Sequence, residues 1–352
     1  MTGTRTAPSE HEATRAATQL ADGRELIYFG ARAATAASVP DRRTDLPRGS
    51  SSSQLRWDPL FEDIAVIAGH RQSRTYRPAG PDCPLCPSRE GRLTEIPAGD
   101  YDVAVFENRF PAFAADAGGR CEVVCFSSDH ERSFALLPAP HAVTVVDALA
   151  DRTAALATAG AEYVLCFENR GAEIGVTLGH PHGQIYGYPY VPPRFARAGD
   201  AAHRYRARTA RCLQCDQLAD ELRDTERIVV ENEHWVAYVP YAARWPYEVR
   251  TVPRRHVPDL PALDVAGRRA LAAIHQDVLR RFDTLFGEPA PYIAAWLQAP
   301  TRRHRDDWHL AGEVFTIRRA ADKLKYLAGA ESVAATWIND IAPETAAERL
   351  RG

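Results

Sequence analysis

The chain contains very little lysine, a single methionine and no long apolar run. Its 352 residues include two lysines, Lys323 and Lys325, so arginine supplies nearly all of the basic charge. No apolar stretch approaches the roughly 18 residues of a membrane-spanning helix, and the N-terminus has no signal-peptide core. We therefore expect a cytoplasmic protein without a membrane partner.

The chain also lacks an excess of basic charge and a phosphate-binding P-loop. The formal net charge is -3 with both signs mixed along the sequence, which argues against a nucleic-acid partner. The motif Gly-x-x-x-x-Gly-Lys-Ser/Thr does not occur, and this excludes a P-loop NTPase. Otherwise the composition is 45% apolar and 25% charged, as is usual for a folded globular protein.

Cysteines are few but unevenly placed. Four of the seven form two Cys-x-x-Cys pairs, Cys83 with Cys86 and Cys212 with Cys215. In a reducing compartment this spacing favours metal ligation over disulfides. The two pairs are therefore candidate metal ligands.

Composition suggests an arm followed by a folded core. Residues 1–55 are expected to be a flexible N-terminal arm and loop, because 1–25 are polar and 40–54 carry proline, glycine and a run of serines. The core is expected to begin near Trp57. Residues 142–160 have a helical pattern, and the polar stretch 194–211 is interpreted as a connection. Strand-like runs are expected at 63–68, 101–106, 121–127 and 163–167.

An internal repeat divides this core into two halves. In both halves a Cys-x-x-Cys pair precedes a glutamate that lies eight residues before a histidine, as Glu122 before His130 and Glu248 before His256. A further histidine follows in each, His180 and then His309. The repeat predicts an α+β fold with two copies of one unit, over residues 56–200 and 201–352.

The sharpest local motif runs from Gly179 to Gln184 and contains two histidines separated by a proline. We expect one of the pair His180 and His182 to bind a metal while the other faces substrate. The alternative is a polar turn with two hydrogen-bonded histidines. A neutral imidazole can attack phosphorus and leave again, dividing a difficult transfer into two steps.

Each half also offers two thiols and two imidazoles, the mixture that suits tetrahedral Zn2+. Four protein ligands imply a structural site, and in the first half such a site would fix His182 through its neighbour His180. The alternatives are buried free cysteines in the first half and coincidence in the second. The predicted ligands are Cys83, Cys86, His130 and His180, then Cys212, Cys215, His256 and His309.

The segment His180-Pro-His-Gly-Gln184 resembles the histidine-triad superfamily, in particular its galactose-1-phosphate uridylyltransferase branch. Further matching pieces in the same order extend the resemblance over about residues 57–351. It implies tandem histidine-triad-like halves, each an antiparallel sheet with helices, and a catalytic first half. By this resemblance His182 forms a nucleotidyl-histidine, and Gln184 binds a phosphoryl oxygen. The implied substrate-binding residues are Arg71, Arg74, Asn108, Asn169, Thr177, Lys325, Tyr326 and Glu331.

The sequence departs from this family pattern at several positions. Better-known members place a second metal on histidines that would fall at Leu297 and Ala311, which favours the Cys212 ligand set instead. Ala311 also stands where the nucleophile would be in the second half, so that half is expected to be structural. His234 and His304 lack matching partners and are expected to have surface or core roles. In the sugar pocket, Ala330 and Trp337 replace residues found in some members.

The resemblance implies a zinc-containing homodimer whose active sites use residues of both chains. The expected reaction exchanges UMP between UDP-glucose and galactose 1-phosphate, or a related sugar 1-phosphate, with ping-pong kinetics. One alternative is a nucleotidylyltransferase with another nucleotide or phosphorylated acceptor in a specialised biosynthetic pathway. Another is a nucleotide-binding module without turnover.

Overall fold

The computed structural model describes residues 14–44, 46, 52–73, 78, 80–113 and 115–352. The helices are α1 (Ala33–Ala37), α2 (Ala139–Thr158), α3 (Pro193–Thr209), α4 (Leu213–Asp224), α5 (Val265–Thr284), α6 (Gly329–Ser332) and α7 (Pro343–Arg351). The strands are β1 (Arg15–Gln19), β2 (Glu25–Phe29), β3 (Gln54–Asp58), β4 (Asp63–Ile67), β5 (Val103–Glu107), β6 (Arg120–Cys125), β7 (Tyr163–Arg170), β8 (His182–Tyr188), β9 (Ile228–Glu231), β10 (Trp235–Tyr238), β11 (Tyr247–Pro253), β12 (Tyr292–Leu297), β13 (Ala311–Thr316), β14 (Arg318–Ala320) and β15 (Lys323–Leu324).

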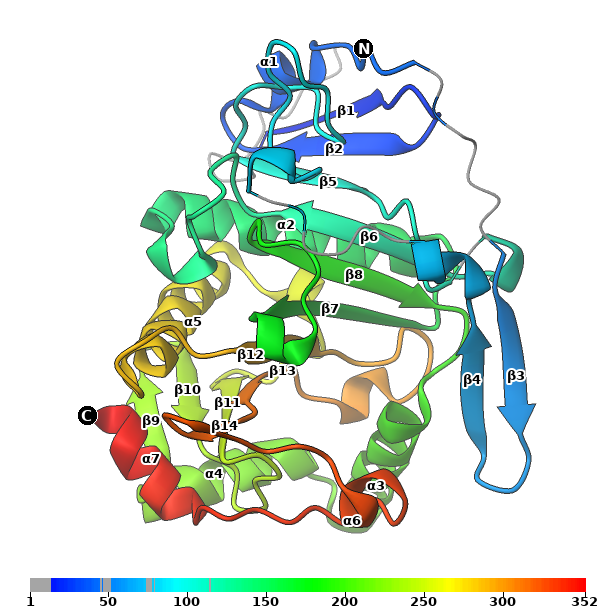
Figure 1. Ribbon diagram of the computed structural model, residues 1–352. Helices are drawn as coiled ribbons and strands as arrows, with labels where there is room; N and C mark the ends of the chain where they lie inside the picture. Colours follow the sequence, from blue (N-terminus) through cyan, green and yellow to red (C-terminus); the bar gives the residue numbers. More distant parts are fainter. Residues whose placement is uncertain (1–13, 45, 47–51, 74–77, 79, 114) are drawn as a thin grey trace, which may run out of the picture.

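An 11-stranded antiparallel sheet organises the molecule, in the order β1-β2-β5-β6-β8-β7-β12-β13-β11-β10-β9. The sheet runs from β1 at the top of Figure 1 to β9 near the C-terminus, while the β3–β4 hairpin projects at one side. The expected strands at 63–68, 101–106, 121–127 and 163–167 are confirmed as β4, β5, β6 and β7, and the expected helix as α2.

The sheet contains two copies of the same unit. Strands β5 and β6, helix α2, and strands β7 and β8 form the first copy, and β10, β11, α5, β12 and β13 repeat this order. In the sheet the copies meet where β7 pairs with β12, with Asn169 opposite Ile293. The predicted α+β fold with a tandem duplication is confirmed. The proposed boundary at residue 200 falls inside α3, and the division into functional halves stays a prediction.

Helices α2 and α5 cover one face of the sheet and contact each other. Their apolar stripes, including Val145 and Leu149 on α2 and Val278 and Phe282 on α5, belong to one core cluster with inward-facing strand residues. Burial of such a stripe is the main stabilising contribution to an amphipathic helix in a folded protein. The opposite face carries two smaller core clusters, one with Phe195 of α3 and Leu218 of α4 and one with Cys83 and Leu85, and it also carries the site.

The expectation of a flexible arm over residues 1–55 is wrong for the part from β1 to α1. Strand β2 is apolar at Leu26, Ile27, Tyr28 and Phe29, and all four side chains are buried. A short run that is apolar at every position fits a strand packed on both faces, and its polar neighbours concealed it. Trp57 is not the start of the core but lies on the hairpin, 57% exposed. Residues 1–13 lie outside the described residues.

The polar stretch 194–211 is mostly helical, rather than a simple connection. Pro193 is the first residue of α3, which suits the unpaired N-terminal turn of a helix. Phe195, Gly199 and Ala202 form the buried side of this helix. The rest of α3 is polar, so composition alone indicated a loop. In the described part of the chain, no helix has both the length and the apolar character needed to cross a membrane.

Candidate active site

Strand β8 begins at His182 and places this side chain on the face of the sheet opposite α2 and α5. Burial alternates along it: Gly183 and Ile185 face the covered core, whereas His182, Gln184 and Tyr186 are partly exposed on the other side. A side chain at Gly183 would meet the Phe126 ring at 3.1 Å, so glycine lets the strand lie close to the core. The alternation of a β-strand thus directs His182 and Gln184 to the same side.

One hydrogen bond fixes the protonation pattern of His182. Its Nδ1 lies 2.7 Å from the carbonyl oxygen of His180, and because a carbonyl oxygen can only accept, Nδ1 must carry the proton. Burial lowers the pKa of His182, although the bond to His180 opposes this effect. The ring is therefore held neutral, with an unprotonated Nε2.

The structure gathers most of the predicted substrate-binding residues in one pocket beside His182. Arg71, Asn108, Asn169 and Thr177 line it together with Gln184. The Asn108 side chain accepts a hydrogen bond from the backbone N–H of Phe110 at 2.8 Å, which leaves its NH2 group as a donor. Donors from several elements thus surround the imidazole. Arg74 lies outside the described residues.

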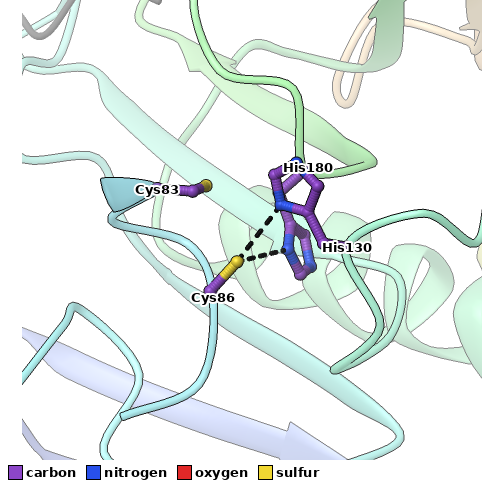
Figure 2. A group of neighbouring side chains, drawn as sticks. All are labelled: Cys83, Cys86, His130 and His180. Atoms are coloured by element: carbon purple, nitrogen blue, oxygen red, sulfur yellow. Dashed lines mark hydrogen bonds between the residues drawn. The ribbon is translucent and has the colours of Figure 1, made fainter. Parts of the chain in front are cut away.

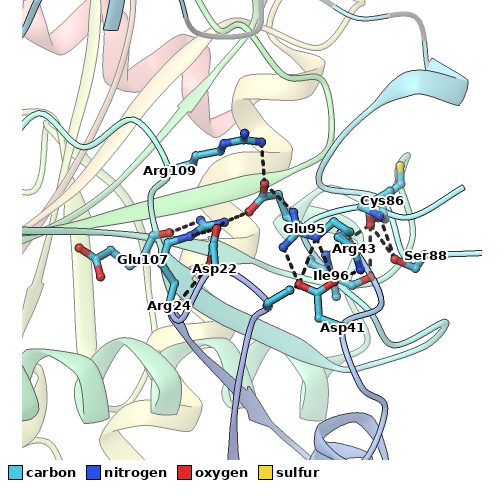
Figure 3. A network of polar contacts seen from close by, with 12 residues as sticks. Asp22, Arg24, Asp41, Arg43, Cys86, Ser88, Glu95, Ile96, Glu107 and Arg109 are labelled. Carbon is cyan, nitrogen blue, oxygen red and sulfur yellow. Dashed lines mark hydrogen bonds and ion pairs between the residues drawn. The ribbon is translucent and has the colours of Figure 1, made fainter. Parts of the chain in front are cut away.

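A polar network that the sequence analysis missed forms another part of the pocket wall. Glu95 lines the pocket and forms ion pairs with Arg24, with Arg43 at 2.9 Å and with Arg109 at 3.6 Å (Figure 3). Arg24 precedes β2, so the N-terminal segment reaches the pocket through Glu95. No short motif marks these residues, because their partners lie far apart in sequence.

The first predicted metal ligands converge next to this pocket. Cys86 Sγ lies 3.1 Å from His130 Nδ1 and 3.6 Å from His180 Nδ1 (Figure 2). A tetrahedral zinc ion separates its sulfur and nitrogen ligands by about 3.6 Å. His180 Nε2 donates to the Ser127 carbonyl at 2.8 Å, so Nδ1 is free to bind a metal. The donor set of Cys83, Cys86, His130 and His180 therefore fits Zn2+.

The four predicted ligands of the second half converge in the same way. Cys215 Sγ lies 3.4 Å from His256 Nδ1 and 3.3 Å from His309 Nδ1. Including Cys212, the four ligand atoms all lie within 4.8 Å of one another. This donor set fits a second tetrahedral zinc, and the repeat has preserved the geometry as well as the residue types.

The second half has no nucleophile at the position equivalent to His182. His309 takes the place of His180 in the second Cys/His cluster, and Val314 faces the same core cluster as Ile185, so Ala311 corresponds to His182 and Glu313 to Gln184. Arg194 and Arg244 bind Glu313 at 3.1 and 2.7 Å. Burial would raise the pKa of Glu313, but these arginines outweigh it and lower the pKa. A carboxylate neutralised by arginines occupies this place.

The residues predicted to contact the sugar lie elsewhere. None of the described residues that line the His182 pocket belongs to 323–338. Lys325 Nζ instead binds Glu331 within its own loop at 2.8 Å, and the Tyr326 side chain is 73% exposed. The single chain therefore does not bring Lys325, Tyr326 and Glu331 to His182.

His304 also differs from the expectation of a histidine without partners. Its ring lies against His203, and its nitrogens contact Asp200 and Asp307. The sequence analysis missed this because His203 and Asp200 lie on α3, which was interpreted as a loop. His234 packs into the turn before β10, where its backbone N–H donates to Asn232 at 3.0 Å.

Comparison with known proteins places the chain among the transferases. Residues 113–192 match the N-terminal domain, and residues 199–352 the C-terminal domain, of galactose-1-phosphate uridyl transferase. A galactose-1-phosphate uridylyltransferase of Streptomyces lividans is 47% identical over 349 residues, 96% of this chain and 97% of the relative. The counterpart from Thermotoga maritima is 34% identical, covering 85% of this chain and 98% of its own. The chain belongs to the galactose-1-phosphate uridylyltransferase family.

Solved structures agree with this assignment. A uridylyltransferase structure is similar with a TM-score of 0.77 and 31% identity, over 85% of this chain and 98% of the other. An ADP-glucose phosphorylase from Arabidopsis thaliana has a TM-score of 0.67 at 23% identity, over 85% of this chain and 98% of the other. The second similarity concerns the fold alone.

Proposed function

We propose that the enzyme transfers UMP from UDP-glucose to galactose 1-phosphate, or to a related sugar 1-phosphate, through a covalent intermediate on His182. The observation that carries this proposal is the hydrogen bond from His182 Nδ1 to the His180 carbonyl. It leaves Nε2 as the nucleophile in a pocket rich in donors. Family membership supports the choice of uridylyl transfer.

Two displacements at phosphorus complete the reaction. In the first, Nε2 of His182 attacks the α-phosphorus of UDP-glucose, an N–P bond forms, and the P–O bond to glucose 1-phosphate breaks. In the second, a phosphate oxygen of galactose 1-phosphate attacks the same phosphorus, and UDP-galactose leaves with the electron pair of the N–P bond returning to Nε2. The leaving group is a phosphate oxygen in the first step and the neutral imidazole of His182 in the second, and neither needs a proton. Ping-pong kinetics follow.

The donors around His182 stabilise the charged phosphoryl oxygens during both steps. Gln184 shares the exposed side of β8 with His182, and its side-chain amide can donate to a phosphoryl oxygen. Arg71, Asn108, Asn169 and Thr177 line the same pocket. Such preorganised donors favour the transition state because they need no reorientation as charge develops. We assign Arg74 the same role by resemblance only.

We further propose that each half holds one structural zinc ion. The zinc of the first half would be bound by Cys83, Cys86, His130 and His180, and would hold these ligands rigidly. His180 provides both a zinc-binding ring and the carbonyl that orients His182. Loss of this metal should therefore affect catalysis as well as folding.

The nucleophile is tested by His182→Gly, which should abolish transfer while the circular dichroism spectrum stays unchanged. Because the substitution opens a cavity at the reacting atom, added imidazole should restore part of the turnover. His234→Gly, outside the pocket, is the control and should retain full activity. Near-normal turnover by His182→Gly without imidazole would rule out the proposed mechanism.

The donor is tested by incubating the protein with individual nucleoside diphosphate sugars and measuring its mass. A true donor leaves its nucleotide on His182, and His182→Gly shows no mass shift. Labelling by an adenosine donor alone would favour the alternative of a nucleotidylyltransferase with another substrate. Binding of nucleotides without labelling or turnover would favour a non-catalytic binding module.

We also propose a homodimer in which the loop 323–338 of one chain completes the pocket of its partner. This loop does not reach the His182 pocket of its own chain, although the resemblance assigns Lys325, Tyr326 and Glu331 to the sugar phosphate. An arrangement across two chains reconciles both observations, because the exposed Tyr326 and Leu327 then face a second subunit.

A further inference from the structure

A third group of side chains of the types that bind metals lies beside the second Cys/His cluster without sharing any of its residues. The second Cys/His cluster consists of Cys212, Cys215, His256 and His309. His203 and Asp200 are on α3, whereas His304 and Asp307 belong to the short turn Arg305–Asp307 and its N-cap. One ligand atom from each of His203, His304 and Asp307 lies within 4.8 Å of the others. These three residues are called the His203 cluster below.

The two imidazoles converge on a single carboxylate oxygen. His203 Nδ1 lies 2.8 Å and His304 Nδ1 lies 3.5 Å from Asp307 Oδ2, and the ring centroids of the two histidines are 4.8 Å apart. Nitrogen and oxygen ligands of a tetrahedral zinc are separated by about 3.3 Å. The two nitrogen-to-oxygen distances lie on either side of this value, so small side-chain shifts would bring the three atoms around one ion.

The hydrogen-bond partner of His304 Nε2 gives a second indication of a metal site. Nε2 lies 3.1 Å from Asp200 Oδ1, and a carboxylate that accepts this proton leaves Nδ1 of the neutral ring without one. In this tautomer Nδ1 and Asp307 Oδ2 are two acceptors facing each other, and a divalent cation between them satisfies both, as a second ring proton also would. A histidine held by a carboxylate on one nitrogen and binding a metal with the other is a recurring arrangement in metal sites.

The arginines near the cluster do not contact the carboxylate oxygen of Asp307 that faces the histidines. Arg206 Nε lies 3.6 Å from Asp307 Oδ1, the oxygen that the histidines do not approach. Arg303 Nη2 lies 3.9 Å from Asp200, on the outer carboxylate. Neither arginine is the near partner of Asp307 Oδ2, so that oxygen remains available to an ion.

We propose that the His203 cluster is a further divalent-cation site, with two imidazole nitrogens and one carboxylate as ligands and water in the remaining positions. This mixture suits Zn2+ and related borderline ions such as Co2+ or Ni2+. The His203 side chain is 58% exposed, so the ion exchanges with solvent. The site differs in this respect from the first Cys/His cluster, in which none of the four ligands is exposed.

A metal here would clamp α3 to the turn that precedes β13. Asp307 and the predicted zinc ligand His309 are on the same segment, and Cys212 follows the end of α3. An ion at the His203 cluster therefore restrains both segments that contribute to the second Cys/His cluster. We expect it to raise the thermal stability of the second half without changing the chemistry at His182.

The test uses the purified full-length protein, depleted of loosely bound metal with a weak chelator and titrated with Co2+. Wild type should bind one more equivalent of Co2+ than His203→Gln at equal zinc content. The additional ion should show only weak visible bands, without the near-ultraviolet charge transfer of cobalt thiolates. Added Co2+ should raise the melting temperature of wild type but not of His203→Gln, while His234→Gln behaves as wild type.

A second variant separates metal binding from a merely structural role. Asp200→Asn keeps all three ligands but weakens the partner of His304 Nε2, and should weaken Co2+ affinity roughly 10- to 100-fold. Equal Co2+ stoichiometry in wild type and His203→Gln would overturn the proposal. Thiolate bands from the additional ion would also overturn it, because they would place this ion in the second Cys/His cluster.

Discussion

At the scale of single residues, His180 joins the metal cluster to the proposed nucleophile. Its ring faces Cys86, its Nε2 binds the Ser127 carbonyl, and its own carbonyl accepts the Nδ1 proton of His182. Three contacts of His180 thus determine the position and the tautomer of His182. A substitution of His180 should for this reason damage His182 without touching substrate.

Glu168 is a buried acid whose titration should be visible in stability. It lies on β7 with 6% of its surface exposed and accepts a hydrogen bond from Tyr292 at 3.0 Å. Burial raises the pKa of Glu168 to about 7 from 4.5, against the opposing effects of Tyr292 and Arg170. The folded protein therefore binds this proton more tightly than the unfolded chain does.

The sign of the pH dependence follows from this shift. From pH 4.5 to about 7 the unfolded chain loses the proton first, so the free energy of unfolding falls as pH rises. The contribution of Glu168 should change by on the order of 3 kcal/mol. Glu168→Gln cannot ionise, and urea unfolding should show it gaining stability relative to wild type between pH 5 and pH 8.

Comparing wild type with Glu168→Gln at each pH cancels the contributions of the other titrating groups to the free energy of unfolding. Burial lowers the pKa of His275 to about 4, so its stabilising contribution is lost as pH falls from 6.5 towards 4, in both chains alike. If the stability difference between wild type and Glu168→Gln were the same at pH 5 and pH 8, Glu168 would not be the buried acid inferred here.

At the scale of elements, a segment could be predicted from the sequence only where a local pattern of residues marks it. The motif around His182 specified its strand, and the paired cysteines with spaced histidines specified both Cys/His clusters. Helix α3 was missed because its buried side has only a few small or aromatic residues, and β2 because its four apolar residues lie among polar ones. Glu95 pairs with Arg24 across 71 positions of the sequence, a contact that no local pattern indicates.

The second Cys/His cluster gives a prediction at this scale. Cys212→Ser should release one of two tightly bound zinc ions per chain and lower the melting temperature by at least about 5 °C, because the metal stabilises the fold that binds it. His182 is unaffected, so residual activity below the melting temperature should stay close to wild type. Zinc analysis after dialysis against a weak chelator measures the loss.

The matched control is Cys166→Ser, a buried cysteine outside both clusters that lies 3.5 Å from the Thr153 hydroxyl. It should keep both zinc ions. One zinc per wild-type chain, or an unchanged zinc content in Cys212→Ser, would show that the second cluster is only a remnant of the duplication.

At the scale of the whole molecule, one continuous sheet unites the unit that carries His182 with a unit that has alanine, Ala311, at the equivalent position. The join at β7 and β12 places Asn169, a pocket residue, opposite Ile293 of the second unit. The second unit thereby supports the pocket wall directly. It also presents the loop 323–338, which contributes no residue to the described lining of the His182 pocket in its own chain.

The proposed exchange of loops between subunits can be tested by mixing two inactive variants. His182→Gly has no nucleophile but an intact loop, and Lys325→Ala has an intact nucleophile but lacks the cation assigned to the sugar phosphate. If sites form across chains, a mixed dimer has one complete site and one site with both defects. Random co-assembly should then restore about a quarter of wild-type activity. If the loop served its own chain, each site of the mixed dimer would keep one defect, and co-expression would restore nothing even when mass spectrometry confirms that mixed dimers are present.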